Sequence, residues 1–265
     1  ILMKVLHVID SGGMYGAENV LLNLVHEQLK LGLYPEIASI GEGNTQEKPL
    51  ERETRSRGYP VSVFRMRPGP NVVGALKLRN YALHNGFDLL HSHGYKGNIL
   101  LGFIPPGIRG LPMLSTLHGY TSTGGMTKMR FYEWLDRLVL PRLDAVVLVS
   151  EAMRGNPKLK RLKGDNFWVI PNGIPPLEEM GRPENDPVFS QVSSFCESGF
   201  IIGAVGRLSR EKGFHHLIDA FGMVALECKE CKLLILGEGG ERERLEAKIC
   251  SLGLQDRALL PGYVK

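Results

Sequence analysis

One stretch decides the fold: Phe200-Ile-Ile-Gly-Ala-Val-Gly-Arg207-Leu-Ser-Arg-Glu-Lys212-Gly213. Its first six residues are mostly apolar and do not alternate with polar ones, which is typical of a strand covered on both faces. After Gly213, apolar residues recur at helical spacing, namely Phe214, Leu217, Ile218, Phe221 and Val224 with Ala225. The stretch therefore predicts a strand, a short loop and a helix, the repeating unit of parallel α/β sheets.

Two cations, Arg207 and Lys212, lie in this loop. The first turn of a helix has unpaired backbone N–H groups and the positive end of the helix dipole, so an anion is stabilised there. The two side chains would add full positive charge. The loop thus predicts a diphosphate-binding site; the alternative is that both cations are ordinary solvated surface residues.

The rest of the chain alternates between strand and helix patterns. We expect strands near 4–9, 36–40, 60–64, 88–91, 112–117, 145–149 and 167–170, with helices at 17–31, 46–57, 71–84, 97–103, 127–140 and a short one from 151. A second set starts at Phe200, with strands near 201–206, 232–236 and 257–260 and helices near 213–227 and 240–252. This alternation predicts an α/β fold with parallel, doubly wound sheets.

The two sets are separated by residues 173–199, which contain Pro175, Pro176, Pro183 and Pro187 and show little periodicity. We therefore predict a domain at 1–172, a connection at 173–199 and a second domain at 200–265. The second set stops after its third strand. We interpret that domain as incomplete.

The motifs, taken in order, resemble those of glycosyltransferase family 4, the retaining sugar transferases of the GT-B architecture. They are Lys4–Glu18 with its glycine-rich loop, Leu117-His118-Gly119, Val169–Ile174, Gly206–Gly213, and Leu233–Arg242. The resemblance spans nearly the whole chain. It implies two Rossmann-like domains that face a cleft, the second of them incomplete here.

The resemblance also implies roles for particular residues. His118 would contact the transferred sugar as the catalytic residue. The donor diphosphate would be bound by Arg207, Lys212 and Gly13, and the donor base and ribose by Glu238 and Gly239. The glycine-rich loop and acceptor side would consist of Gly12, Gly16, Glu18 and His93. The reaction would move a hexose from a nucleotide diphosphate sugar to a hydroxyl acceptor, in the synthesis of a polysaccharide, glycolipid or related glycoconjugate, without a cofactor or a metal.

Other interpretations compete with this one. Ser11–Gly16 approximates the dinucleotide fingerprint, with Ser11 in place of the first glycine, and Glu42 follows the second strand where a ribose-binding acid would lie, so an NAD-dependent dehydrogenase is an alternative. A GT-B nucleotide-sugar epimerase and a non-catalytic binding module are two more. The part of the family's donor domain that carries a two-glutamate motif is missing, so we expect this chain by itself to be inactive.

Composition indicates an ordinary globular protein with 43% hydrophobic and 23% charged residues and a net charge of +4. No apolar run is long enough to span a bilayer, and we expect a cytoplasmic protein. We interpret Cys228-x-x-Cys231 as two small, half-buried thiols rather than a redox or zinc site. His91 and His93 are spaced for metal binding, although packing or acceptor contact is the preferred interpretation.

Residues 128–163 carry a local excess of positive charge, with nine Lys or Arg against four acids. Phe131, Trp134 and Leu138 lie in the same region, a combination suited to an anionic membrane surface or a lipid-linked acceptor. The plainer interpretation is a helix that packs its aromatic face into the domain while its cations are solvated. No nucleic-acid module is recognisable, so nucleic acid is not an expected partner.

Overall fold

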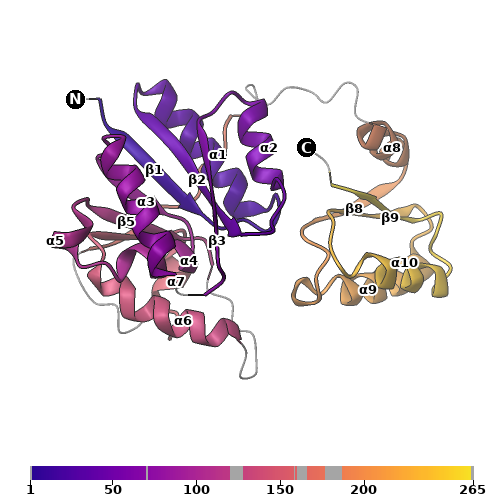
Figure 1. Ribbon diagram of the computed structural model, residues 1–265. Coiled ribbons are helices and arrows are strands. Elements are labelled where there is room, and N and C mark those ends of the chain that lie inside the picture. Colours follow the sequence, from indigo (N-terminus) through magenta and orange to yellow (C-terminus); the bar gives the residue numbers. More distant parts are fainter. Residues whose placement is uncertain are drawn as a thin grey trace. The chain divides into compact units, whose positions relative to one another are not determined.

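The computed structural model describes residues 2–69, 71–119, 128–157, 159, 166–176 and 187–263. The chain divides into two compact units, Ile1–Pro175 and Pro176–Lys265 (Figure 1). Each unit has a parallel sheet of its own, so each is described by itself.

The first unit contains a seven-stranded sheet in the order β3-β2-β1-β4-β5-β6-β7. All paired strands are parallel. The strands are β1 (Lys4–Ile9), β2 (Tyr34–Glu42), β3 (Val61–Met66), β4 (Leu89–Ser92), β5 (Met113–Leu117), β6 (Ala145–Leu148) and β7 (Phe167–Val169). The order reverses between β1 and β4, and the carboxyl ends of strands at such a switch point are where doubly wound sheets bind ligands.

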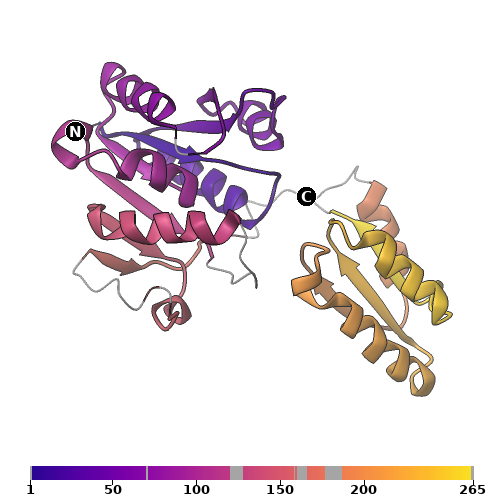
Figure 2. The ribbon, with the colours of Figure 1, turned by 60° about the horizontal axis from the view of Figure 1, so that its bottom comes forward.

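Helices cover both faces of this sheet (Figure 2). They are α1 (Gly16–Lys30), α2 (Pro49–Ser56), α3 (Val72–His84), α4 (Tyr95–Gly102), α5 (Pro106–Arg109), α6 (Lys128–Val139), η1 (Leu140–Arg142) and α7 (Glu151–Arg154). Leu6 and Val8 of β1 belong to the core formed with α3 and α4, whereas Ile9 belongs to a second core with α1 and α2. Because side chains alternate along a strand, His7 lies on the same face as Ile9, beneath α1.

The second unit has a three-stranded parallel sheet in the order β10-β9-β8. Its elements are α8 (Pro187–Cys196), β8 (Phe200–Val205), η3 (Arg210–Lys212), α9 (Phe214–Glu227), β9 (Cys231–Leu236), α10 (Arg242–Ser251) and β10 (Ala258–Gly262). Figure 1 shows α9 and α10 side by side on one face and α8 on the other. The predicted stripe of α9 is confirmed at Phe214, Ile218, Phe221 and Ala225, which are buried.

This unit differs from the sequence expectations in two respects. The predicted connection 173–199 contains a helix that was not predicted, Pro187–Cys196, and the prolines allow it because they lie before the helix or at its first position, where the missing N–H costs nothing. The strand at 200–205 was expected to be covered on both faces. It is the edge strand of the sheet among the described residues, and Phe200 and Val205 are 67% and 81% exposed.

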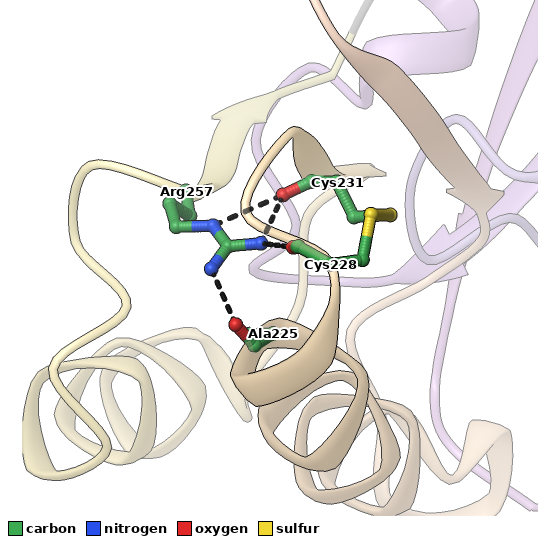
Figure 3. Close-up of a disulfide and its surroundings, with 4 residues drawn as sticks. All are labelled: Ala225, Cys228, Cys231 and Arg257. Carbon is green, nitrogen blue, oxygen red and sulfur yellow. Dashed lines mark hydrogen bonds between the residues drawn. A yellow bond between two sulfur atoms is a disulfide. The ribbon is translucent and has the colours of Figure 1, made fainter.

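The turn between α9 and β9 is closed by a disulfide between Cys228 and Cys231, which corrects our interpretation of these residues as free thiols. Figure 3 shows Arg257 beside this turn. Its guanidinium donates to the backbone oxygens of Ala225 (2.8 Å), Cys231 (2.7 Å) and Cys228. The turn is therefore held by a covalent bond and by one arginine side chain.

Candidate active site

Four histidines lie near one another in the first unit. His7 comes from β1, His91 and His93 from the end of β4, and His118 from the residue after β5. Strand register explains the grouping, since His7 lies directly opposite His91, and His93 follows two residues later on the same face. The switch point of the sheet thus gathers imidazoles that are up to 111 residues apart in the sequence.

Three of these rings form a continuous hydrogen-bonded series. Nε2 of His118 lies 3.1 Å from Nδ1 of His93, and Nε2 of His93 lies 3.0 Å from Nδ1 of His7. Nε2 of His7 lies 2.7 Å from Oε1 of Gln28, on α1. Nδ1 of His118 is buried and has no hydrogen-bond partner within the described part of the chain.

Burial keeps these histidines neutral near physiological pH. It lowers the pKa of His118 to about 4, and it lowers the pKa of His7 to about 4 although the hydrogen bond with Gln28 acts in the opposite direction. Burial, followed by the neighbouring imidazoles, sets the pKa of His91 and of His93 well below the usual range. The cluster therefore offers hydrogen-bonding nitrogens rather than positive charge.

Ring nitrogens of His7, His91 and His93 lie within 4.8 Å of one another, a spacing that could hold a metal ion. Most of them already have a partner in the protein. Both nitrogens of His7 and both of His93 are in the series above, and Nε2 of His91 lies 2.8 Å from Oγ1 of Thr116. A metal would have to break that series, so hydrogen bonding accounts for the cluster better than coordination does.

His93 was expected on the acceptor side, but its side chain is buried. Both of its ring nitrogens face other histidines, so it lies behind His118 rather than at a surface open to an acceptor. His7 and Gln28 were missed by the sequence reasoning. A polar residue in the middle of an otherwise apolar strand, as His7 is in Lys4–Ile9, was the available signal, because a buried polar group needs a partner.

The glycine-rich loop connects β1 to α1. Oγ of Ser11 donates to the backbone oxygen of Gly13 (2.6 Å), which closes the turn. The carboxylate of Glu18 accepts from the backbone N–H of Tyr15 (3.0 Å), so Glu18 caps the start of α1. A Cβ atom at Gly12 or Gly16 would meet nothing within 4 Å, which leaves room for a ligand beside this loop.

A pocket of about 410 Å³ opens beside this loop. It is lined by Asp10, Ser11, Gly12, Glu42, Thr45, Gln46, Glu47, Lys48, Pro49 and Lys96. Asp10 accepts from two lysines, with Lys48 Nζ at 2.6 Å and Lys96 Nζ at 2.7 Å. The pocket thus presents charges of both signs and many hydrogen-bonding groups, which suits a polyhydroxylated molecule.

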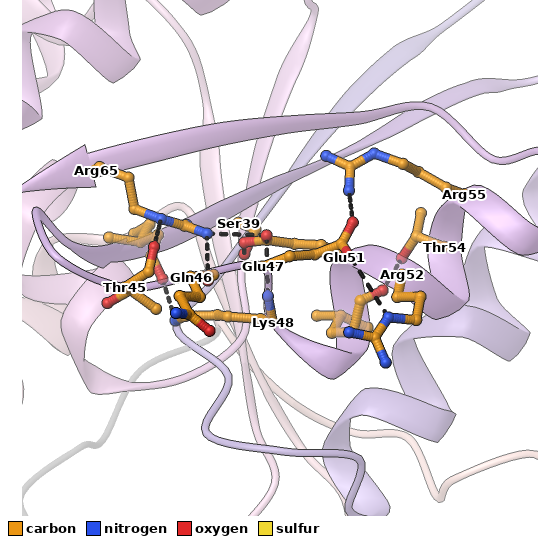
Figure 4. Close-up of polar contacts among 12 residues, drawn as sticks. Ser39, Thr45, Gln46, Glu47, Lys48, Glu51, Arg52, Thr54, Arg55 and Arg65 are labelled. Carbon is orange, nitrogen blue, oxygen red and sulfur yellow. Dashed lines mark hydrogen bonds and ion pairs between the residues drawn. The ribbon is translucent and has the colours of Figure 1, made fainter.

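Glu51 forms polar contacts with residues next to and within the pocket lining (Figure 4). Its buried carboxylate accepts from Ser39 Oγ (2.6 Å), the backbone N–H of Lys48 (3.1 Å) and Arg65 Nη2 (2.8 Å). Burial raises the pKa of Glu51, but these hydrogen bonds outweigh that effect and the pKa lies below its usual value. Arg65 also donates to the backbone oxygens of Thr45 and Gln46, so one ionised pair fixes the loop before α2.

In the second unit, the predicted diphosphate loop is exposed and charged. Arg207 forms an ion pair with Glu211 (2.5 Å), and Lys212 ends the turn η3. Gly213 has a φ of 68°, in the left-handed region that favours glycine, and precedes the first residue of α9. Hydrogen bonds from Ser209 and Arg207 lower the pKa of Glu211 to about 2, so this carboxylate is ionised beside the loop.

The loop after β9 lies directly against this one. The backbone N–H of Leu208 donates to the oxygen of Glu238 (2.8 Å), and that of Glu241 donates to the oxygen of Leu208 (3.0 Å). A Cβ atom on Gly237 or Gly239 would collide with the backbone of Gly206 or Leu208, so both glycines are required by this close approach. The structure therefore brings the two predicted donor motifs together at one edge of the sheet.

Glu238 has a second contact that the sequence did not indicate. Its carboxylate accepts two hydrogen bonds from Arg242, from Nε at 2.9 Å and from Nη2 at 2.7 Å. Arg242 in turn donates to Glu246 and to the backbone oxygen of Leu260. Glu238 thus stabilises the start of α10 whether or not it also contacts a ligand.

The aromatic helix α6 has an arrangement opposite to the plainer expectation. Phe131, Trp134 and Leu138 are 53%, 48% and 43% exposed, whereas Glu133 and Asp136 are buried. Asp136 accepts from Nδ2 of Asn98 on α4 (2.8 Å), which explains why an acidic residue faces the domain. Lys158, Lys160, Arg161 and Lys163 of the predicted basic region lie outside the described residues.

The two parallel sheets, with candidate ligand sites at the carboxyl ends of their strands, define an α/β protein of the GT-B class. Residues 14–176 match the model of Glycosyltransferase Family 4, and residues 186–265 match that of Glycosyl transferases group 1. The first match alone covers more than half of the chain, so this chain belongs to glycosyltransferase family 4.

Curated relatives include several sugar transferases. The chain is 30% identical to 2-deoxystreptamine glucosyltransferase of Streptomyces kanamyceticus over 97 residues, which are 36% of this chain and 25% of that protein. It is 26% identical to the phosphatidylinositol N-acetylglucosaminyltransferase GPI3 subunit of Saccharomyces cerevisiae over 208 residues, 76% of this chain and 44% of that protein. The chain thus spans less than half the length of these relatives.

Solved structures confirm the fold. HepE of Anabaena, in complex with UDP, superposes with a TM-score of 0.75 at 21% identity over 99% of this chain and 70% of that one. WaaG, a glycosyltransferase involved in lipopolysaccharide biosynthesis, superposes with a TM-score of 0.68 at 14% identity over 98% of this chain and 70% of that one. In the part of the chain that the structure describes, no helix is both long and apolar enough to cross a bilayer.

Proposed function

We propose that this protein is a retaining hexosyltransferase that uses a nucleotide diphosphate sugar as donor and a hydroxyl group as acceptor. The loop Gly206–Gly213 carries this proposal, because it combines two cations, a helix start and a close neighbouring glycine loop. Arg207 and Lys212 would bind the diphosphate and stabilise the negative charge that develops on the leaving group. Glu238 and Gly239 would lie beside the ribose and base.

His118 would act on the transferred sugar as a neutral imidazole. With a pKa of about 4, its ring carries no charge at neutral pH and cannot supply a full positive charge to the departing phosphate. Its contribution would be a hydrogen bond made by a ring held in a fixed orientation. Arg207 and Lys212 are then the groups left to neutralise the diphosphate.

The pocket beside the glycine-rich loop is the proposed acceptor site. Asp10, Lys48 and Lys96 form a fixed set of donors and acceptors there, and Gly12 leaves space for a hydroxyl-bearing molecule. Glu42 also lines this pocket. In the dehydrogenase alternative, Glu42 would be the acid that binds the ribose of the cofactor. Because the chain belongs to glycosyltransferase family 4, we assign this pocket to a hydroxyl acceptor and not to a nicotinamide cofactor.

The direct test is calorimetric titration with nucleoside diphosphates, followed by transfer assays with a panel of nucleotide sugars and hydroxyl acceptors. We expect saturable binding of at least one nucleoside diphosphate, and a product whose anomeric configuration is that of the donor. Inversion at the anomeric carbon would contradict the retaining mechanism. Saturable NAD binding without binding of any nucleoside diphosphate would instead support the dehydrogenase alternative.

We also propose that α6 docks on the cytoplasmic face of an anionic membrane, where a lipid-linked acceptor would be available. Phe131, Trp134 and Leu138 form an exposed apolar stripe, and Arg130 and Arg142 lie in the same stretch. Exposed aromatic residues beside cations favour the interface of an anionic bilayer.

Co-sedimentation with vesicles tests this docking. The protein should sediment with vesicles of phosphatidylglycerol and phosphatidylcholine, and Trp134→Ser should reduce the bound fraction severalfold. Trp168→Ser is the matched control, since Trp168 is also exposed but lies on β7. Equal losses in the two variants, or no sedimentation of the unchanged protein, would contradict docking through α6.

A further inference from the structure

The hydrogen bonds behind His118 have a direction. An amide oxygen can only accept, so in the contact with Oε1 of Gln28 the Nε2 atom of His7 must carry the proton. A neutral imidazole has one N–H, and therefore Nδ1 of His7 accepts. The proton of the next contact must then lie on Nε2 of His93.

The same reasoning applies once more along the series. Since Nε2 of His93 donates, its Nδ1 accepts, and the proton between the last two rings lies on Nε2 of His118. His118 is then left with an unprotonated Nδ1, the atom that is buried without a partner in the described part of the chain. A buried acceptor without a partner is costly, so it marks a place where a donor group is expected.

We infer that Gln28, His7 and His93 are positioning residues that fix the tautomer of His118 and present its Nδ1 atom as an acceptor for a hydroxyl group of the bound sugar. This inference rests on the proposed contact between His118 and the transferred sugar. It goes beyond that contact in naming which ring nitrogen is used, in which hydrogen-bonding role, and which three residues impose the choice.

Neighbouring rings support a positioning role. His91 packs on His93 with ring centroids 4.0 Å apart, and Nε2 of His91 is held by Thr116 (2.8 Å). The rings of the series therefore have little freedom to turn over. Gln28 also limits the chemistry, because an amide oxygen is a very weak base and cannot take a proton from His7, so the series orients His118 without carrying a proton away.

The test exploits the partly buried position of Gln28, which tolerates other polar side chains better than a core residue would. In Gln28→Glu a carboxylate can still only accept, whereas in Gln28→Lys an ammonium can only donate. The lysine should reverse every step of the series, so that the proton of His118 moves from Nε2 to Nδ1.

The tautomer of His118 is read by nitrogen NMR of the whole chain labelled with ¹⁵N-histidine, at neutral to mildly basic pH. We expect protonated Nε2 in the unchanged protein and in Gln28→Glu, and protonated Nδ1 in Gln28→Lys. If the lysine variant fails to fold, Gln28→Leu replaces it, and we expect a mixture of both tautomers. The inference would be overturned if His118 had the same tautomer in the unchanged protein and in the folded variant that lacks the amide oxygen of Gln28, either Gln28→Lys or Gln28→Leu.

The second measurement is turnover, made in a longer form of the protein that carries a complete donor domain, since this chain by itself is expected to be inactive. Gln28→Lys should lower kcat by roughly a hundredfold, the usual effect of losing one oriented hydrogen bond in the transition state, with little change in nucleoside diphosphate affinity. Glu27→Gln, at the exposed preceding residue, is the control and should keep normal turnover. If no sugar transfer exists the proposed function fails, yet the NMR result still decides whether Gln28 sets the tautomer.

Discussion

The histidine series of the first unit and the cationic loop of the second lie at equivalent ends of parallel strands but prepare their groups in opposite ways. His7 and His93 are buried and uncharged, and hydrogen bonds fix their rings. Arg207 and Lys212 are exposed and fully charged. Burial therefore fixes the orientation of the histidine rings in the first unit, and exposure preserves the charge of the cations in the second. A single environment could not do both, because burial disfavours the charged form of a side chain.

The largest effect expected from this difference is on stability in acid. The pKa of His7 falls from 6.5 in the unfolded chain to about 4 in the folded one, so between these values the unfolded state binds more protons. The free energy of unfolding should have its full value above about pH 6.5 and should decrease as the pH falls toward 4. At pH 4, His7 alone should account for about 3 kcal/mol of this loss. Thermal unfolding of the chain across this range measures the decline.

His7→Gln is the informative variant for that experiment, because it removes one titrating ring while retaining a side chain that can hydrogen-bond. It should flatten the acid decline relative to the unchanged protein. Parallel pH profiles in the two proteins would show that His7 is already accessible to protons.

The next largest effect is expected on catalysis, and it isolates the neutral site. In a longer form of the protein with a complete donor domain, His118→Ala should lower turnover by roughly a hundredfold and change nucleoside diphosphate affinity by less than about twofold, because the contact matters mainly in the transition state. Steady-state kinetics and calorimetry separate the two quantities. His84→Ala, at the exposed end of α3, is the control; a similar fall in that variant would remove the special role of His118.

A smaller effect isolates the charged site. Arg207→Ala and Lys212→Ala should each weaken nucleoside diphosphate binding by about tenfold, because each removes a charge-assisted contact to phosphate. Arg210→Ala is a matched control, since Arg210 is an exposed cation on the same turn. Equal losses in all three variants would indicate a general electrostatic effect instead of two specific contacts.

The smallest expected effect concerns the framework of the second unit. Reducing the bond between Cys228 and Cys231 should lower the free energy of unfolding by at most about 2 kcal/mol, because the closed loop is very short. Arg257 continues to bond the backbone of the turn after reduction. Chemical denaturation with and without reductant provides the measurement, and a loss above about 3 kcal/mol would mean that the disulfide, and not Arg257, holds the turn.

Much of the fold could be predicted because it depends on local pattern. Strands such as Lys4–Ile9 and helices such as Phe214–Glu227 have apolar spacing that decides their structure. The exposure of Val205 could not be predicted, since it depends on which strands pair beside β8. Helix α8 was missed because the prolines of 173–199 indicated a connection, and none of the helix residues is buried.

The same distinction between local pattern and tertiary arrangement applies to the candidate site. Arg207, Lys212 and Glu238 were proposed from the sequence because each lies in a short motif. His7 and Gln28 were not, because the contact between them spans 21 residues and the contact with His93 spans 86. Hydrogen bonds between residues this far apart depend on sheet order and register, and no local spacing encodes them.

The contacts of Arg257 predict which positions of this turn should vary among related sequences. Its guanidinium donates to backbone oxygens at positions 225, 228 and 231, and every amino acid supplies such an oxygen. The side chains at those positions are therefore free to drift in related sequences, the two cysteines included, whereas an arginine at 257 is not easily replaced, because no other side chain offers as many donors in one plane. In an alignment of relatives, the cationic position rather than the cysteine pair should be the constant one.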